Sequence, residues 1–344
     1  MRALVLRGPG DVSDRGPLEM VDLPVPEPEP DGVVIRVSAC GVCRTDLDLA
    51  QGRLVPPHFP LVPGHQIVGV VSAVGARVRD RREGDRVGAA WIRWACGECR
   101  WCRAGLENLC PDFQANGCDA NGGYAEYVAV PSAYTFPLPQ AIDDLHAAPL
   151  LCAGAIGWRS LRLANLRDGD PLGLAGFGAS AHLVLQMARK RYANSDICVF
   201  ARSIEERGFA KELGAAWVGD TSDTPPFGLA AIIDTTPAWK PVVEALPRLM
   251  PGGRLVINAI RKSNADRDEL TRIDYATSLW MEREIKSVAN VTRADVHELL
   301  EFAATTHLEA TIDARPLKEA NVALHRLAEG KGLRGATVLR VHDA

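Results

Sequence analysis

Four cysteines crowd into fifteen residues of the 344-residue chain, in the spacing CxxCxxCx₇C: Cys96, Cys99, Cys102 and Cys110. This spacing can wrap four thiolates round one tetrahedral zinc ion, and such a site, with no open coordination position, is structural. The spacing alone leaves two alternatives open, an iron–sulfur cluster and four incidental thiols. The chain has nine cysteines, an odd number, and in a cytosolic protein this clustering indicates metal rather than disulfides.

A glycine-rich segment, GFGASA, follows an apolar run and opens a helical pattern at Gly176. In a dinucleotide-binding turn the first glycine permits the tight turn, and the second lets the pyrophosphate approach the backbone. The small third residue lets the helix pack on the strand. Three small residues between a strand and a helix can also be simple packing. Because strands and helices alternate on both sides, we interpret Gly176, Gly178 and Ala181 as cofactor-binding residues.

The end of the next predicted strand indicates which nicotinamide dinucleotide is bound. NAD-specific turns of this kind carry an Asp or Glu there, which hydrogen-bonds the ribose hydroxyls. Here the positions hold Ala201, Arg202 and Ser203. A missing carboxylate removes repulsion against a 2′-phosphate, and an arginine offers a bidentate charge-assisted contact. The sequence therefore favours NADP over NAD, although Arg202 solvated at a strand end is the simpler alternative.

Two kinds of pattern must position these residues. The first half reads as short β-strands separated by Gly and Pro, an all-β domain of about 150 residues. The strands expected there are Met1–Arg7, Val33–Ser38, Gln66–Val71, Asp85–Ala90 and Tyr124–Val130. After Cys152, strands and helices alternate, which predicts a doubly wound parallel sheet of six strands.

The expected strands of that sheet are Leu172–Ala175, Ile197–Phe200, Ala216–Val218, Ala231–Asp234, Arg254–Asn258 and Glu284–Val288. The helices expected between and after them are Ser180–Lys190, Ile204–Leu213, Lys240–Met250, Ala276–Glu282, Ala294–Thr305 and Leu317–Ala328. A closing strand at Ala336–Val341 is expected to return to the first domain.

The composition is that of an ordinary globular protein, with 47% hydrophobic and 24% charged residues and a formal net charge of −4. No basic face for nucleic acid or an anionic membrane is expected, and small neutral ligands fit best. The chain has no apolar run of signal-peptide or membrane-span length. We therefore expect a soluble, cytoplasmic protein.

Taken together, the segments "GVCRTD", "PGHQ", "CGECRWCRAGLENLC", "GGYAEY", "LLCAG" and "GLAGFGASA" resemble the zinc-containing medium-chain dehydrogenase/reductase family, in family order and over essentially the whole chain. The resemblance implies an α/β protein with a GroES-like β-rich catalytic domain, residues 1–153 and 290–344. It also implies a Rossmann NAD(P)-binding domain over residues 154–289.

Three potential metal ligands lie too far apart in the chain for their spacing to join them: Cys43, His65 and Cys152. Each alone is more often a core residue than a ligand. The resemblance implies that they bind a catalytic zinc with an open fourth position, while the four-cysteine segment holds a structural zinc, giving two zinc ions per chain. It also implies that Asp46 orients the ligand histidine. A cysteine as the third ligand looks like the alcohol dehydrogenase branch of the family.

The resemblance further assigns the start of a proton relay to Thr45, two residues after the first zinc cysteine. Downstream, where many relatives carry histidines, this chain has Asp48. Asp48 is either the next proton acceptor or a solvated surface residue. Arg44 replaces a frequent histidine and is a candidate contact for the cofactor pyrophosphate.

Trp91 aligns with an aromatic residue of the substrate channel, although it could be plain core, and Leu54 stands where some relatives have a tryptophan. The expected reaction is reversible hydride transfer between NAD(P) and a primary alcohol or aldehyde, with medium-chain and aromatic substrates as candidates. The alternatives are a dedicated biosynthetic aldehyde reductase and a turnover-deficient cofactor-binding relative. By analogy with the family, the chain is expected to form a homo-oligomer, a tetramer or a dimer.

Overall fold

The structure, a computed structural model, describes residues 1–13, 15–330 and 334–342. The chain divides into two compact units, Met1–Ala155 with Asn290–Ala344 and Ile156–Ala289. We expected the division after residue 153. The observed division falls two residues later, inside the helix α4 (Ala153–Ala164). No helix in the described ranges is long and apolar enough to cross a membrane.

One long apolar strand, β3 (Gly32–Val42), organises the first unit. β4 (Gln66–Val74) pairs with it in antiparallel fashion along most of its length. Along its other edge, β8 pairs with the first part of β3 and β17 with the last part. The other strands of this seven-stranded sheet are β5 (Arg86–Ala89), β8 (Tyr127–Pro131), β9 (Thr135–Pro137), β16 (Ile312–Pro316) and β17 (Ala336–Arg340). The predicted return of the closing strand to the first domain is therefore confirmed.

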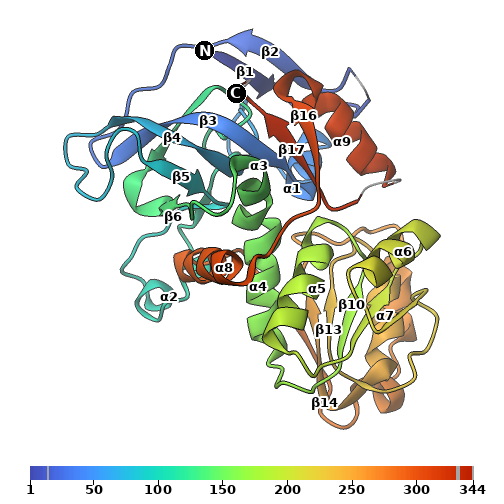
Figure 1. The fold of residues 1–344 in the computed structure, drawn as a ribbon. Helices are drawn as coiled ribbons and strands as arrows, with labels where there is room; N and C mark the ends of the chain where they lie inside the picture. Colours follow the sequence, from blue (N-terminus) through green and yellow to red (C-terminus); the bar gives the residue numbers. More distant parts are fainter. Residues whose placement is uncertain (14, 331–333, 343–344) are drawn as a thin grey trace. The chain divides into compact units, whose positions relative to one another are not determined.

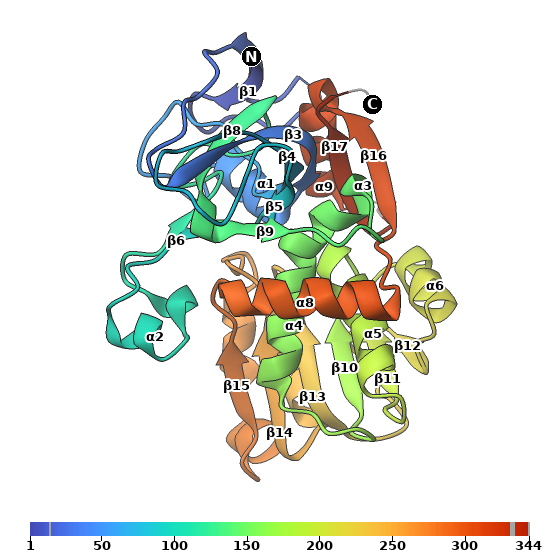
Figure 2. The same ribbon diagram turned by 60° about the vertical axis from the view of Figure 1, so that its left-hand side comes forward.

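The first unit has further strands and helices outside this sheet (Figures 1 and 2). Its strands outside the main sheet are β1 (Arg2–Leu6), β2 (Leu18–Asp22), β6 (Ile92–Trp94) and β7 (Gln114–Ala115). Its helices are α1 (Arg44–Ala50), α2 (Arg100–Arg103), α3 (Asp144–Ala147), α8 (Arg293–Thr306) and α9 (Ala320–Glu329). α8 begins at a capping box in which Thr292 Oγ1 accepts a hydrogen bond from the backbone N–H of Asp295, so its start is fixed by the sequence.

The second unit is a parallel sheet of six strands in the order β12-β11-β10-β13-β14-β15. The strands are β10 (Leu172–Ala175), β11 (Ile197–Phe200), β12 (Trp217–Gly219), β13 (Leu229–Asp234), β14 (Leu249–Ile257) and β15 (Glu284–Ser287). β10 and β11 are buried at every residue, as central strands covered on both faces must be. The order reverses between β10 and β13, and in such sheets ligands bind at the carboxyl ends of the strands beside this reversal. The predicted fold class is confirmed.

The helices of the second unit are α4, α5 (Ala179–Arg191), α6 (Ile204–Glu212) and α7 (Lys240–Ala245). α4 and α5 lie over one face of the sheet (Figure 2). They approach closely, because a Cβ at Gly157 would lie 2.7 Å from Val184 Cγ2.

Two expected helices of this unit differ from the structure, one in its end and one in its kind. The helix expected at 240–250 ends at Ala245, and the chain enters β14 at Leu249, because Pro247 removes a backbone donor where the helix would continue. The helix expected at 276–282 is a single π-helical turn, Tyr275–Leu279, after which Met281 and Glu282 take positive φ values of 71° and 61°. Positive φ is incompatible with a continuing helix.

Candidate functional site

Three distant segments of the first unit bring Cys43, His65 and Cys152 together. Their ligand atoms all lie within 4.8 Å of one another. Cys43 Sγ lies 3.9 Å from Cys152 Sγ, and His65 Nε2 lies 3.2 Å from the same sulfur. His65 is fully buried, and both cysteines are half-buried.

The pairing of β3 with β4 explains this convergence. Gly41 near the end of β3 is opposite Gln66 at the start of β4. Cys43, which follows β3, and His65, which precedes β4, therefore lie at the same end of the sheet. The strands pack tightly there, because a Cβ at Gly41 would lie 2.8 Å from the Gln66 side chain. Cys43 is also the N-cap of α1. Cys152 arrives from a separate stretch, just before α4.

Asp46 holds this arrangement in place. Its carboxylate accepts hydrogen bonds from the backbone N–H of Cys43 at 2.8 Å, the backbone N–H of Gly64 at 3.2 Å and Tyr124 Oη at 3.1 Å. His65 Nδ1 lies 3.3 Å from Asp46 Oδ1, which leaves Nε2 facing Cys152. A carboxylate behind the ring fixes the orientation of a ligand histidine, and Asp46 is placed to do so here.

The electrostatics of the cluster suit a cation. Burial lowers the pKa of His65, but Asp46 and Cys43 raise it more strongly, and the resulting pKa is about 10. The hydrogen bond from Cys152 holds the pKa of the Cys43 thiol well below its usual value, while Cys43 and burial raise the pKa of Cys152. The His65 imidazole thus lies among three groups that can carry negative charge, the Cys43 and Cys152 sulfurs and the Asp46 carboxylate, and such surroundings favour a bound cation.

The separations also fit one tetrahedral zinc ion. Bonds of about 2.3 Å to sulfur and about 2.0 Å to nitrogen place two ligand sulfurs about 3.8 Å apart and a sulfur and a nitrogen about 3.5 Å apart. The observed 3.9 Å and 3.2 Å are close to these values. Because the set supplies three donor atoms, a fourth position would stay open for a further ligand.

The two residues expected to carry protons lie on α1, one turn apart. Thr45 is buried, and its Oγ1 lies 3.7 Å from Cys43 Sγ. Asp48 is 4% exposed and forms an ion pair with Arg53, whose Nη2 lies 2.6 Å from Asp48 Oδ1. Burial raises the pKa of Asp48, and Arg53 opposes that shift. The surface alternative for Asp48 is wrong, because the residue is buried and its carboxylate is paired with Arg53. Arg44, the first residue of the same helix, is half-buried.

The predicted pocket residues lie in the same unit. The Trp91 ring stands edge-on to His65, with ring centroids 4.9 Å apart and planes at 79°. Trp91 Nε1 donates to Asn290 Oδ1 at 2.9 Å. Leu54 packs at the edge of the apolar core, as Trp91 also does. Trp91 is therefore both a core contact and the neighbour of the candidate ligand histidine.

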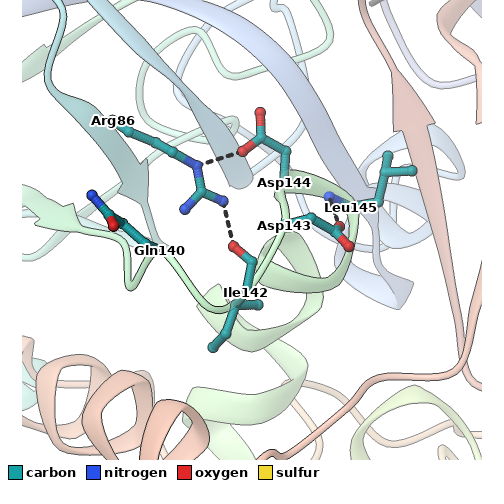
Figure 3. Close-up of a pocket in the computed structure, with 6 residues that line it drawn as sticks. All are labelled: Arg86, Gln140, Ile142, Asp143, Asp144 and Leu145. Atoms are coloured by element: carbon teal, nitrogen blue, oxygen red, sulfur yellow. Dashed lines mark hydrogen bonds and ion pairs between the residues drawn. The ribbon is translucent and has the colours of Figure 1, made fainter.

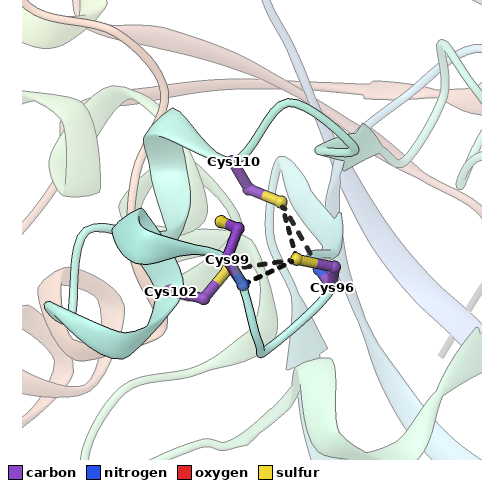
Figure 4. Close-up of side chains that lie close together, drawn as sticks. All are labelled: Cys96, Cys99, Cys102 and Cys110. Carbon is purple, nitrogen blue, oxygen red and sulfur yellow. Dashed lines mark hydrogen bonds between the residues drawn. The ribbon is translucent and has the colours of Figure 1, made fainter.

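The four-cysteine segment forms a separate lobe, Cys96–Cys110, whose sulfurs converge on one point (Figure 4). Cys96 Sγ lies 3.5 Å from Cys110 Sγ and 3.9 Å from Cys102 Sγ. Two backbone N–H groups point at these sulfurs, from Cys99 to Cys96 Sγ and from Cys96 to Cys110 Sγ. Such separations suit ligands that share one ion. A cluster, whose thiolates bind different iron atoms, needs them spread wider.

The dinucleotide fingerprint lies between β10 and α5. Gly176 has a φ of +81°, and a Cβ there would lie 2.9 Å from Thr235 Oγ1. Gly178 is the N-cap of α5, and Ala181 is fully buried. The tight turn at Gly176 and the small packing residue Ala181 thus agree with the fingerprint, and the approach of a pyrophosphate to Gly178 stays a prediction.

The end of β11 departs in part from the expectation. Arg202 is exposed there. Ser203 is the N-cap of α6, and its Oγ accepts the Glu206 backbone N–H at 3.0 Å, so its hydroxyl already has a structural partner. Arg207, on the first turns of α6, holds the same segment: its Nη2 donates to the Arg202 carbonyl at 2.9 Å.

The first unit also has a pocket of about 530 Å³ (Figure 3). Its lining residues are Arg86, Gln140, Ile142, Asp143, Asp144 and Leu145. The Arg86 guanidinium is bound to the Asp144 carboxylate at 2.6 Å and to the carbonyls of Pro139 and Ile142. This side chain is engaged within the protein, and the pocket shows no chemistry comparable to that of the cysteine and histidine cluster.

Comparison with known proteins agrees with the fold and these motifs. Residues 29–140 match the alcohol dehydrogenase GroES-like domain. The chain is 44% identical to a probable alcohol dehydrogenase, AdhA, of Mycobacterium tuberculosis, over 99% of this chain and 97% of that protein. It is 32% identical to an alcohol dehydrogenase of Geobacillus stearothermophilus, over 95% of this chain and 96% of that protein.

Among solved structures, an NAD-dependent alcohol dehydrogenase matches with a TM-score of 0.86 and 28% identity, covering 99% of this chain and 100% of that one. The fold and motifs define a medium-chain oxidoreductase with a GroES-like domain and a Rossmann domain. Within that class, the chain belongs to the alcohol dehydrogenase family.

Proposed function

We propose that this protein is a zinc-dependent alcohol dehydrogenase that transfers a hydride reversibly between NAD(P) and a primary alcohol or its aldehyde. The observation that carries the proposal is the convergence of Cys43, His65 and Cys152, with Asp46 behind the histidine. Zinc bound by these three ligands would act as a Lewis acid toward the oxygen of the alcohol or aldehyde. The aromatic wall at Trp91 and the apolar Leu54 favour medium-chain and aromatic substrates over polyols.

The chain's own residues account for the movement of the proton. Thr45 Oγ1 is the hydroxyl nearest the ligand set on α1. It can accept the proton of the substrate hydroxyl while donating its own, as a relay requires. Asp48, one turn further along the same face, is the next acceptor. Arg53 pairs with Asp48 and favours its ionised form, which is the form that can accept the proton.

Metal analysis combined with activity tests the proposal. The purified protein is expected to contain two zinc ions per chain, one at each cysteine cluster. Cys152→Ser should leave one zinc and lower kcat by at least a hundredfold, while Cys118→Ser, which changes a buried cysteine outside both clusters, keeps both ions and activity. Zinc in the lobe alone, in a wild-type protein without alcohol oxidation, would favour the turnover-deficient alternative.

For the cofactor, we propose a preference for NADP. Arg202 is exposed at the end of β11, and Arg207 donates to its carbonyl. Charge-assisted hydrogen bonds contribute about 1.5–3 kcal/mol, so Arg202→Ala should lower the ratio of kcat/KM for NADP to that for NAD by roughly ten- to a hundredfold. A wild-type enzyme with higher catalytic efficiency for NAD would refute the preference. The relative described as NAD-dependent makes this comparison necessary.

We also propose that the chain forms a homo-oligomer, a dimer or a tetramer, through β15. β15 is exposed along its length and pairs with β14 alone among the strands in the described ranges. Large apolar side chains are exposed on this strand and in the segment that leads into it: Tyr275, Trp280, Met281 and Ile285. An unpaired edge with an apolar patch favours pairing with another chain.

Light scattering on the intact protein tests the assembly. Ile285→Lys should lower the molecular mass in solution, whereas Ile204→Lys, at an exposed apolar position on α6, should not. A monomeric wild-type protein would exclude the assembly. None of the nine cysteines, all of which lie in the described ranges, forms a disulfide, which suits a reducing compartment such as the cytoplasm.

A further inference from the structure

An uninterrupted series of contacts joins the four-cysteine lobe to the candidate catalytic histidine. Asn290 Nδ2 donates to the backbone carbonyl of Asn108, inside the lobe, at 3.1 Å. Asn290 Oδ1 accepts from Trp91 Nε1 at 2.9 Å, and the Trp91 ring packs edge-on against His65 at 4.9 Å. All four residues belong to the first unit. The Asn290 side-chain amide thus bonds the lobe through its nitrogen and Trp91, the neighbour of His65, through its oxygen.

The lobe is held firmly where Asn290 contacts it. The neighbouring Glu107, which is 9% exposed, accepts from the Arg293 backbone N–H at 2.7 Å and from Arg293 Nη2 at 2.9 Å. The Arg293 guanidinium lies over the Tyr134 ring, 4.8 Å from its centroid. Tyr134 Oη in turn bonds the backbone of Ala95, next to the first lobe cysteine. Several hydrogen bonds therefore fix the segment 290–293 against the lobe.

We propose that Asn290 is a positioning residue for the alcohol dehydrogenase reaction. It fixes the plane of the Trp91 ring beside His65, and it takes its own position from the lobe. The lobe would then contribute to substrate selectivity through this link as well as to folding. The inference rests on the proposed function, because it needs His65 to lie at the reacting metal.

The side chain at this position is tightly specified. Asn290 has a φ of 52°, in the left-handed region, where Asn, Asp and Gly are tolerated best. The Asn290 amide donates to a carbonyl through its nitrogen and accepts from an indole through its oxygen, so two separate atoms make the two bonds. Asn290→Gly keeps the backbone permitted and removes both bonds. Asn290→Asp keeps the acceptor for Trp91 but turns the bond to the Asn108 carbonyl into a contact between two oxygens.

Three variants of the full-length enzyme test the proposal: Asn290→Gly, Asn290→Asp and the matched control Asn165→Gly. Asn165 has a φ of 55° and is exposed in the second unit, so it reports the general effect of replacing a left-handed asparagine. The first readout is the indole N–H signal of Trp91 in ¹⁵N-labelled protein, assigned by its absence in Trp91→Phe. The second is kcat and KM for a short and a bulky primary alcohol, with zinc content measured in parallel.

In Asn290→Gly the Trp91 signal should move, and KM should change roughly three- to tenfold, by different factors for the two alcohols, as expected for the loss of about 1 kcal/mol of hydrogen bonding. The effect on kcat should be smaller, and zinc content should stay at the wild-type value. In Asn290→Asp the same signal should move as well, because the lobe no longer holds the side chain. Asn165→Gly should change neither readout.

An unmoved Trp91 signal in Asn290→Gly, or a moved signal with unchanged KM values for both alcohols, would overturn the proposal. A moved signal in Asn290→Gly but not in Asn290→Asp would overturn the part played by the lobe. If Asn290→Gly does not fold, Asn290→Asp decides by the same two readouts. A wild-type enzyme that oxidises no alcohol would instead refute the proposed function, and the indole signals would still report whether Asn290 fixes Trp91.

Discussion

His182 makes the second unit sensitive to acid. It lies on α5, one residue after the last small residue of the dinucleotide fingerprint, and is fully buried. Its ring stacks near Phe209, with centroids 6.1 Å apart, and Nδ1 lies 3.4 Å from the Gly178 carbonyl. Burial lowers the pKa of His182 to about 4, although hydrogen bonds to the backbone at Gly178 and Ala179 favour the charged form. The folded protein therefore binds a proton here less readily than the unfolded chain does.

The sign and size of the effect follow from proton linkage. An unfolded histidine has a pKa of about 6.5, so between pH 6.5 and pH 4 the unfolded chain is protonated while folded His182 is not. The stability contributed by neutral His182 is fully present above pH 6.5 and is lost as the pH falls. One pH unit corresponds to about 1.4 kcal/mol, which gives about 2 kcal/mol lost at pH 5. For a domain of this size that is a fall in Tm of about 8 °C.

Thermal unfolding of the intact enzyme at pH 7 and pH 5 measures this effect. Replacing His182 by Gln removes the titrating group and keeps a side chain that can donate to the Gly178 carbonyl. The loss of Tm between the two pH values should be smaller by about 8 °C in His182→Gln than in the wild type. His58→Gln, which changes an exposed histidine of the first unit, serves as the control and should behave like the wild type. Equal losses in wild type and His182→Gln would refute the reasoning.

Three other changes have defined outcomes. Lys262 donates to Asp234, and the two side chains are 7% and 0% exposed. Lys262→Met should therefore lower the free energy of unfolding, measured in urea, by about 3–5 kcal/mol. A smaller loss in the double variant Asp234→Asn/Lys262→Met would show that the unpaired Asp234 charge causes the effect. Tyr124→Phe removes one hydroxyl bonded to Asp46 and should speed zinc transfer to a colorimetric chelator by roughly ten- to a hundredfold, and an unchanged rate would exclude Tyr124 from the support of the metal site. Cys96→Ser removes the sulfur at the centre of the lobe and should leave one zinc per chain with a lower Tm, whereas retention of two zinc ions would show that three thiolates suffice.

The second unit was the more predictable part of the fold. β10 and β11 have the predicted bounds, because short apolar runs between turn-formers can only be central strands in an alternating pattern. Between Cys152 and β10 the structure has α4, a helix that the sequence pattern did not predict. Gly154 and Gly157 weaken the helical pattern there, and the close packing of Gly157 on Val184, which explains that glycine, is visible only in three dimensions.

The two cysteine clusters differ in how far sequence could reach them. The lobe is local in the chain, so its spacing favoured four thiols that converge on one metal, with incidental thiols as an open alternative. The other set joins residues from three separate segments, and what unites them is the register of β3 against β4, which no spacing encodes. Only the resemblance to a family could propose that set. Asn290 carries no sequence signal at all, because its role depends on two partners in other segments and a left-handed backbone.

Asp46 shows why folding and chemistry are hard to separate in this site. Its carboxylate accepts the Cys43 backbone N–H, while the Cys43 sulfur accepts the Asp46 backbone N–H, so the two residues form the capping box of α1. The same two side chains would also hold and orient the metal set. Losing such a cap costs about 1 kcal/mol, so an Asp46 variant changes helix stability and histidine orientation together, and its activity cannot distinguish them. Tyr124 Oη donates to Asp46 Oδ2, the same oxygen that accepts the Cys43 backbone N–H, but Tyr124 is not itself a partner of the capping box. Removing its hydroxyl therefore leaves both capping partners in place and tests how much the support of the Asp46 carboxylate matters for the metal set.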